Sequence, residues 1–100
     1  MNYIQENFNK FVPVVHRYGN NGRLAVSYTI DKEYGPETAC TATINLPDEL
    51  LAFDEVIIKD YSENEGLYLC MLNAGHIGPE LRRVSSGFII APVCKLLLPY

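Results

Sequence analysis

The sequence predicts an α+β domain in which one principal helix packs on a mostly antiparallel sheet of four to six strands. Two observations lead to this prediction. Several segments alternate apolar and polar residues and are joined by turns rich in glycine and asparagine, as antiparallel strands are. One longer segment instead repeats its apolar residues with helical spacing. At 100 residues the chain has the length of one domain, residues 1–100.

The first half of the chain predicts a three-stranded meander. Strand-like residues fill Val12–Tyr18, and the turn Gly19–Gly22 leads to a second strand at Arg23–Ile30. A second turn at Asp31–Pro36 precedes another alternating segment, Ala39–Leu46. The apolar residues expected on one face of the second strand are Leu24, Val26, Tyr28 and Ile30.

The second half predicts a strand followed by the principal helix. Proline and two acids in Leu46–Glu49 favour a short helical turn. Val56–Ile58 begins the next strand. Ser62 and Glu65 have the spacing of a capping box, which predicts a helix over Glu63–Asn73. The apolar stripe of that helix is expected at Leu67, Cys70, Met71 and Ala74.

The remaining residues predict the strands that complete the sheet. Gly75 ends the helix, and strands are expected at Leu81–Val84 and Phe88–Leu98. Because proline cannot donate a ladder hydrogen bond, Pro13 is expected near a sheet edge or a strand start, and Pro92 at a bulge or an edge. The apolar tail after Lys95 is expected to pack in the core or in an interface.

Composition excludes several classes of function. Apolar residues make up 48% of the chain and charged residues 20%, which is ordinary for a folded domain. The net charge is -4, and the eight basic residues are scattered, so the chain lacks the basic patch that direct nucleic-acid binding requires.

The cysteines and the termini predict a cytoplasmic location. Cys40, Cys70 and Cys94 are odd in number and lie in separate apolar runs, as in a reduced protein. The first residues lack the pattern of a signal peptide. The apolar runs are too short and too interrupted to span a bilayer, so no membrane partner is expected.

No catalytic, cofactor or metal signature is present, and the sequence therefore predicts a protein that is not an enzyme. The histidines, His16 and His76, have no spacing that brings a cysteine beside them as a nucleophilic pair. There is no Cys-x-x-Cys or His-x-x-x-His cluster for a metal ion. Gly19–Gly22 lacks the lysine of a phosphate-binding loop.

Acidic residues concentrate in one segment and suggest a binding surface. Seven of the twelve acids lie between residues 48 and 65, where Lys59 is the only basic residue. Such a concentration attracts a basic surface on a partner protein. The residues expected to contact the partner are Asp60, Tyr61, Glu63, Asn64 and Glu65.

Other interpretations of these features stay open. The acids are also typical of a solvated face that only aids solubility. A homodimer that pairs strand edges at Val12–Tyr18 or at Lys95–Tyr100 is a second interpretation. A small enzyme that uses carboxylates between Asp60 and Glu65 as acid and base is a third, and it requires a cleft in which burial separates their pKa values.

Several short segments together resemble a family of small uncharacterised bacterial proteins, a domain of unknown function found in gut bacteria, their phages and their conjugative elements. The segments are Tyr18–Ala25, Thr43–Pro47, Ile58–Gly66, Gly75–Ile77, Ser86–Phe88 and Pro92–Leu96. The resemblance covers the chain from about Tyr18 onward and leaves residues 1–17 unmatched. It implies an accessory protein of a mobile element or phage, and it brings no established activity and no functional residue.

Overall fold

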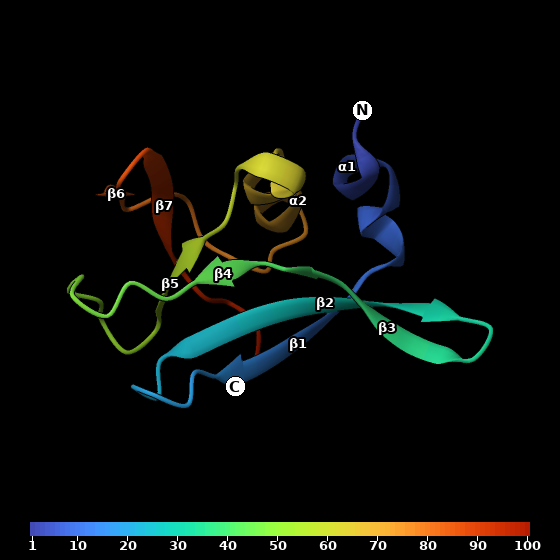
Figure 1. The fold of residues 1–100 in the computed structure, drawn as a ribbon, viewed down its shortest axis with the longest axis horizontal. Coiled ribbons are helices and arrows are strands. Elements are labelled where there is room, and N and C mark those ends of the chain that lie inside the picture. Colours follow the sequence, from blue (N-terminus) through green and yellow to red (C-terminus); the bar gives the residue numbers. More distant parts are fainter.

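Two antiparallel sheets and two short helices make up the fold (Figure 1). A computed structural model describes all residues from 1 to 100. The α+β class and the antiparallel pairing are confirmed, but two helices replace the single one expected and seven strands form two sheets. The elements are α1 (Tyr3–Asn7), η1 (Phe8–Lys10), β1 (Val12–Arg17), β2 (Leu24–Lys32), β3 (Gly35–Thr41), β4 (Thr43–Ile44), β5 (Glu55–Ile58), η2 (Ser62–Asn64), α2 (Leu67–Asn73), β6 (Arg82–Ser86) and β7 (Ile89–Lys95).

The three-stranded meander β1-β2-β3 forms as the alternation predicts. Gly22 has φ +70° in the turn between β1 and β2, a backbone conformation that suits glycine. The predicted inner face of β2 is buried along its whole length. A bulge at Ala39 interrupts β3, because Tyr28 pairs with Cys40 while Thr29 pairs with Thr38. Pro13 lies on the edge strand β1, as expected.

Ala42 carries the chain from the first sheet to the second. Its amide donates to the Val26 carbonyl of β2 (2.8 Å), and its carbonyl accepts from the Lys59 amide just after β5 (2.8 Å). The next residue, Thr43, is buried, and its hydroxyl accepts a hydrogen bond from the Val26 amide (3.1 Å). The Tyr18 hydroxyl also pairs with Thr43 (2.9 Å). The two sheets are therefore joined through hydrogen bonds as well as through the chain.

The second sheet has the strand order β4-β5-β7-β6, so the C-terminal strand is central. The predicted edge at Lys95–Tyr100 is wrong, because Lys95 pairs with Glu55 of β5 and no strand follows it. Pro92 lies in β7 opposite Arg83, just beyond the Ile57–Val93 pair at which the ladder with β5 ends. The expected bulge or edge position is therefore wrong, and β7 tolerates the missing N–H because Pro92 lies beyond the end of its ladder with β5.

The predicted capping box at Ser62 is wrong, and so is the continuous helix over Glu63–Asn73. Residues Ser62–Asn64 form a single 3-10 turn without a side-chain cap, and Ser62 itself has φ +54°. Gly66, at φ +93°, then turns the chain into the separate helix α2. Tertiary contacts override the local signal, since the Asp60 side chain caps α2 by accepting from the Tyr68 amide (2.9 Å).

The segment Leu46–Glu49 forms a turn and no helix. The Glu49 amide donates to the Leu46 carbonyl (3.0 Å), and the chain then continues irregularly to β5. Arg23 holds this turn from β2, because its guanidinium donates to the carbonyls of Leu46 and Glu49. The proline and the two acids that predicted a helical start therefore lie in a single hydrogen-bonded turn.

The N-terminal segment forms the helix that the sequence prediction left out. α1 begins at the N-cap Asn2, whose side chain accepts from the Gln5 amide (2.9 Å), while the Gln5 side chain accepts from the Asn2 amide (3.1 Å). This is a complete capping box. In Figure 1, α1 (blue) and α2 (yellow) stand side by side on the same side of the sheets. The prediction of one principal helix missed this second helix.

The main core lies between the helices and both sheets. It contains Ile4, Phe11, Leu24, Val26, Tyr28, Ile30, Cys40, Ala42, Val56, Ile58, Leu67, Met71, Ile77, Cys94 and Leu96. Within the predicted stripe of α2, Leu67 and Met71 are fully buried, whereas Ala74 is exposed. Of the apolar tail, Leu96 is buried, and Leu98 packs on the core while Leu97 is half exposed. None of the helices combines the length and the apolar character needed to cross a membrane.

Candidate binding groove between the N-terminal segment and α2

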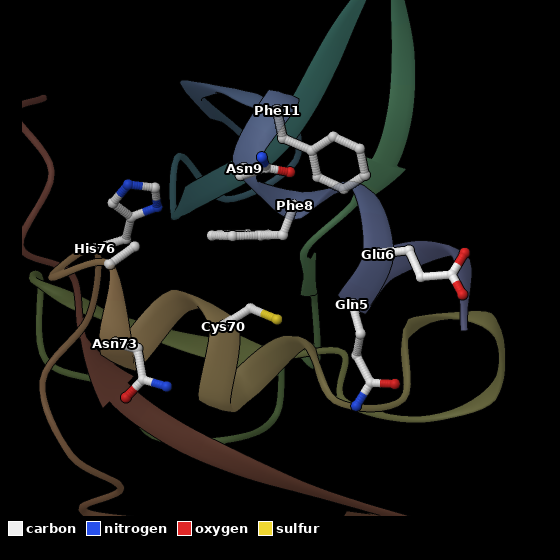
Figure 2. Close-up of a pocket in the computed structure, with 9 residues that line it drawn as sticks. Gln5, Glu6, Phe8, Asn9, Phe11, Cys70, Asn73 and His76 are labelled. Atoms are coloured by element: carbon white, nitrogen blue, oxygen red, sulfur yellow. The ribbon is translucent and has the colours of Figure 1, made fainter. Parts of the chain in front are cut away.

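The largest hollow in the molecule is an open groove of about 700 Å³ between the N-terminal segment and α2. Figure 2 shows Phe8 of the N-terminal segment facing Cys70 of α2, with His76 at one end, while the side chains of Glu6 and Asn73 point outward at the margins. The lining residues are Gln5, Glu6, Phe8, Asn9, Phe11, Cys70, Asn73, Ala74 and His76. Two smaller hollows, of about 260 and 230 Å³, lie on other parts of the surface.

Close contacts at one end of the groove fix α1 against the loop before α2. The Asn2 side-chain amide donates to the Glu65 carbonyl (2.6 Å). The Gln5 side chain lies directly over Gly66, where an added Cβ would meet Nε2 at 2.7 Å. Ile4 is buried in the core between these contacts. The separation of the two walls is therefore set by these packing contacts.

Aromatic rings form the deeper part of the groove. The Phe8 ring lies 5.8 Å from Phe11, 5.1 Å from Tyr28 and 5.8 Å from His76, measured between ring centroids. Tyr28 and His76 are stacked, also at 5.8 Å, and the Tyr28 hydroxyl pairs with Nδ1 of His76 at 2.7 Å. Such a cluster offers ring faces and edges to a flat or apolar group.

Burial shifts the titration of the two paired groups in opposite directions. It lowers the pKa of His76 from its ordinary 6.5, because the imidazolium would lose hydration. It also raises the pKa of Tyr28 well above its ordinary 10.0. Both groups are thus neutral at pH 7, and their hydrogen bond joins a neutral phenol to a neutral imidazole.

The rim of the groove carries polar groups that have no partner within the chain. Glu6 and Asn9 come from the N-terminal segment and Asn73 from the end of α2, and all three side chains are exposed. None of them makes a hydrogen bond or an ion pair in the protein. One carboxylate and two amides therefore remain available to a ligand at the margin of the groove.

Cys70 contributes a thiol to the groove, but the thiol is not activated. Burial, followed by the negative charge of Asp60, raises its pKa above the ordinary 9.0. It is not hydrogen bonded to His76, whose Nδ1 pairs with Tyr28 instead. Nucleophilic cysteines need a thiolate beside a base, so this arrangement favours binding over covalent chemistry.

Three of the five predicted partner-contacting residues have structural roles. Asp60 caps α2 through the Tyr68 amide. Asn64 is 1% exposed, and its side-chain amide donates to the Thr41 carbonyl (2.7 Å), while its Oδ1 is buried without a partner. Tyr61 is half-buried and has Lys59 Nζ 5.8 Å from its ring centroid.

The other two, Glu63 and Glu65, are exposed. Glu63 forms an ion pair with Lys59 at 2.6 Å, which lowers the pKa of Glu63 and raises that of Lys59. Glu65 makes no ion pair and lies beside the N-terminal segment, since its carbonyl receives the Asn2 side chain. Glu65 is thus the member of the predicted set that reaches the region of the groove with its charge unpaired.

The acidic segment as a whole does not form one continuous face. β5 lies within it, and the acids on this strand and next to it have basic partners. Glu55 binds Arg82 (2.9 Å), which lowers the pKa of Glu55, and Asp54 lies 3.8 Å from Lys95. Charge counted along the sequence therefore overstated the negative charge that the surface presents.

The groove residues were missed because the N-terminal segment was left unassigned. A usable signal was present, namely the spacing of Asn2 and Gln5, which fits an N-cap and its third helical residue. Phe8 and Phe11, three residues apart, would then fall on one side of the following turn. The contributions of Asn73 and His76 depend on tertiary packing and have no local signal.

The chain contains no group of three or more histidine, cysteine or acidic side chains arranged to hold a metal ion. The free thiols of Cys40 and Cys94 are buried and lie outside the groove. Comparisons with models of protein families, with curated proteins and with solved structures found no match, so the resemblance to the bacterial family stays a prediction.

Proposed function

We propose that this protein is a small binding protein that holds a short arginine-bearing segment of a partner protein in the groove between the N-terminal segment and α2. The observation that carries this proposal is the combination of an aromatic interior with the unpartnered carboxylate of Glu6 at the rim. A guanidinium stacks on an aromatic face and pairs with a carboxylate at the same time, which an ammonium does less well.

The remaining polar groups suit an extended peptide. The amides of Asn9 and Asn73 each offer a donor and an acceptor, as a peptide backbone requires. The volume of about 700 Å³ is within the usual range for ligand sites and accommodates only a few residues. The unpaired charge of Glu65 near the Gln5 end supports the same preference for a basic partner, as does the net charge of -4.

This proposal keeps the predicted basic partner and moves the contact surface. Of the predicted residues, Glu65 remains near the proposed site, whereas Asp60 and Asn64 support it from within. The enzyme alternative has less support, because Asp60 is engaged as a cap and Glu63 is paired with Lys59. A cytoplasmic role in a phage or mobile element is proposed from the resemblance and from the three free thiols.

The test is a titration of the isotopically labelled protein with capped peptides, followed by amide chemical shifts. Three peptides of identical sequence carry arginine, lysine or citrulline at the central position. We expect the arginine peptide to shift amides of Glu6, Phe8, Asn9 and Asn73, the lysine peptide to bind more weakly, and the neutral citrulline peptide to bind weakest. Shifts confined to other surfaces, or equal affinity for all three peptides, would contradict the proposal.

Glu6→Gln is the matched variant, because Glu6 is exposed and makes no contact that folding depends on. It should lower the affinity for the arginine peptide by about threefold to tenfold, the usual range for one partly exposed charge-assisted hydrogen bond. Glu33→Gln, at an exposed position in the turn between β2 and β3, makes the same change in net charge and should leave the affinity unchanged.

A further inference from the structure

The edge strand β6 is the least protected sheet edge of the molecule. Edges are usually blocked by proline, by a bulge, by shortness or by charged side chains. β1 contains Pro13, β3 contains Pro36 and the bulge at Ala39, and β4 has only two residues. β6, Arg82–Ser86, has no proline and no internal bulge and pairs with β7 in regular register, and the charges of Arg82 and Arg83 are neutralised by ion pairs with Glu55 and Glu80.

Exposed apolar side chains flank this edge at both ends. Leu81, just before β6, is 57% exposed, and Phe88, just after it, is fully exposed. Ile90 on the neighbouring strand is 61% exposed. An unblocked edge with apolar residues at its two ends is typical of a strand-pairing interface.

The register of β6 indicates which backbone groups point outward. Arg83 pairs with Pro92, which has no N–H, so this pair cannot exchange two hydrogen bonds. In an antiparallel ladder, the residue of a non-bonded pair directs its own N–H and carbonyl away from its partner strand. By the same alternation, Arg83 and Ser85 present their backbone groups on the open side of β6.

We infer that two copies of this chain associate through antiparallel pairing of their β6 strands, centred on Val84. In this register Arg83 lies opposite Ser85 of the second copy, and the outward groups of these two residues can exchange both hydrogen bonds. The twofold symmetry repeats the pair on the other side of Val84, so the two sheets join into one eight-stranded sheet.

Charge and apolar surface are compatible with this register. Arg82 falls opposite Ser86 of the second copy and Arg83 opposite Ser85, so no two arginines face each other directly. Each Arg83 also keeps its own ion pair with Glu80 (2.7 Å), which reduces diagonal repulsion across the axis. Leu81, whose amide donates to the Val93 carbonyl just before β6, then lies near the Gly87–Phe88 turn of the second copy, so the exposed apolar residues meet at both ends of the edge.

This edge differs from the two that the sequence suggested. Pro13 removes one backbone N–H donor from the edge of β1. β7, which ends at Lys95, is already paired on both sides. β6 also lies outside the groove, because none of its residues lines that hollow. Dimerisation and peptide binding can therefore be tested separately.

The test compares two opposite charges at one exposed position by sedimentation equilibrium over protein concentrations up to about 1 mM. Ser85→Glu places a carboxylate opposite Arg83 of the second copy, twice per dimer, and should lower the dissociation constant at least threefold. Ser85→Lys places like charges there and should raise it at least tenfold. Thr38→Glu and Thr38→Lys, at an exposed position on β3, serve as controls and should leave it unchanged.

A backbone variant and an apolar variant complete the test. Ser85→Pro removes an outward donor without removing a bond to β7 and should abolish the dimer, and Phe88→Ser should weaken it. Circular dichroism and thermal melts check that each variant is folded. A wild-type protein that stays monomeric throughout would overturn the inference, as would equal effects of Ser85→Glu and Ser85→Lys.

Discussion

At the scale of single residues, the most constrained position in the molecule is Gly66. Its backbone has φ +93°, which strains any residue with a side chain, and the Gln5 side chain occupies the space that a Cβ would need. Gly66 also separates η2 from α2 and lies next to the anchor of α1 at Glu65. One residue thus determines both the start of α2 and how closely the N-terminal segment approaches it.

We expect Gly66→Ala to destabilise the protein more than Gly75→Ala does. Both positions have positive φ, so both changes carry a backbone cost of about 1–2 kcal/mol. Only at Gly66 does the new Cβ collide with the exposed Gln5 side chain, which must then leave its bond to the Asn2 amide, and losing this bond adds about 0.5–1 kcal/mol. Urea unfolding of the two variants gives the difference directly, and equal losses would show that Gln5 moves aside freely.

His76 should make stability depend on pH just below neutrality. Because burial lowers its pKa, the folded state binds fewer protons than the unfolded state near pH 6, so the free energy of unfolding rises with pH there. The stabilisation is complete above the ordinary value of 6.5 and is lost as the pH falls through the lowered pKa.

The measurement is urea unfolding at several pH values between about 5 and 8, the range in which a histidine titrates. His76→Gln should flatten the profile, because it removes the group whose pKa burial lowers. The pKa values of Glu55 and Glu63 are lowered from the ordinary 4.5. These two carboxylates therefore change the free energy of unfolding only below pH 4.5, outside the measured range. If the free energy of unfolding of the His76 variant changed with pH as steeply as that of the wild type, other groups would be responsible for the pH dependence.

At the scale of elements, the strands and the start of α1 have local signals in the sequence, whereas the start of α2 does not. Alternation along β2 and the Gly19–Gly22 turn are local signals with few competing interpretations, and both were correct. The Ser62–Glu65 spacing is equally local, yet the buried Asn64 and the cap from Asp60 impose another conformation. α1 has only five residues, which is too few for a stable isolated helix, so it forms because it packs against α2 and the core.

The true and the false capping box give different mutational outcomes. Asn2→Ala removes the cap of α1 and its bond to the Glu65 carbonyl, and should cost about 1 kcal/mol or more of unfolding free energy. Ser62→Ala removes no hydrogen bond and should change the free energy of unfolding by less than about 0.5 kcal/mol. Ser62→Gly should stabilise the protein by less than about 1 kcal/mol, because relief of the positive φ exceeds the extra unfolded-state entropy of glycine. A loss from Ser62→Ala as large as that from Asn2→Ala would contradict these assignments.

At the scale of the whole molecule, two sheets share one core. Fifteen buried residues from both sheets and both helices form a single cluster, and Ala42 hydrogen bonds to each sheet. Neither sheet could keep its inner face dry if the other unfolded. The groove lies over this shared core, so core packing holds its walls in place, and no pattern within the sequence reveals that the helices and His76 meet there.

Thermal unfolding should therefore be one cooperative transition. Calorimetry is expected to give equal calorimetric and van't Hoff enthalpies, as for other single domains of this size. Melts followed at the tyrosines, which lie mainly in the first sheet and the segments around it, should coincide with melts followed by backbone circular dichroism. Two separated transitions would show that the second sheet unfolds independently, in spite of the shared core.

The graded burial of the three thiols provides a chemical reporter for the groove. Burial raises the pKa of Cys40 to about 11 and that of Cys94 to about 12, and both side chains are almost inaccessible. Cys70 is the least enclosed of the three and lies in the groove wall. A maleimide should therefore modify Cys70 first in the native protein, and a peptide seated in the groove should slow that reaction. The unmutated protein thus carries a built-in kinetic readout of occupancy.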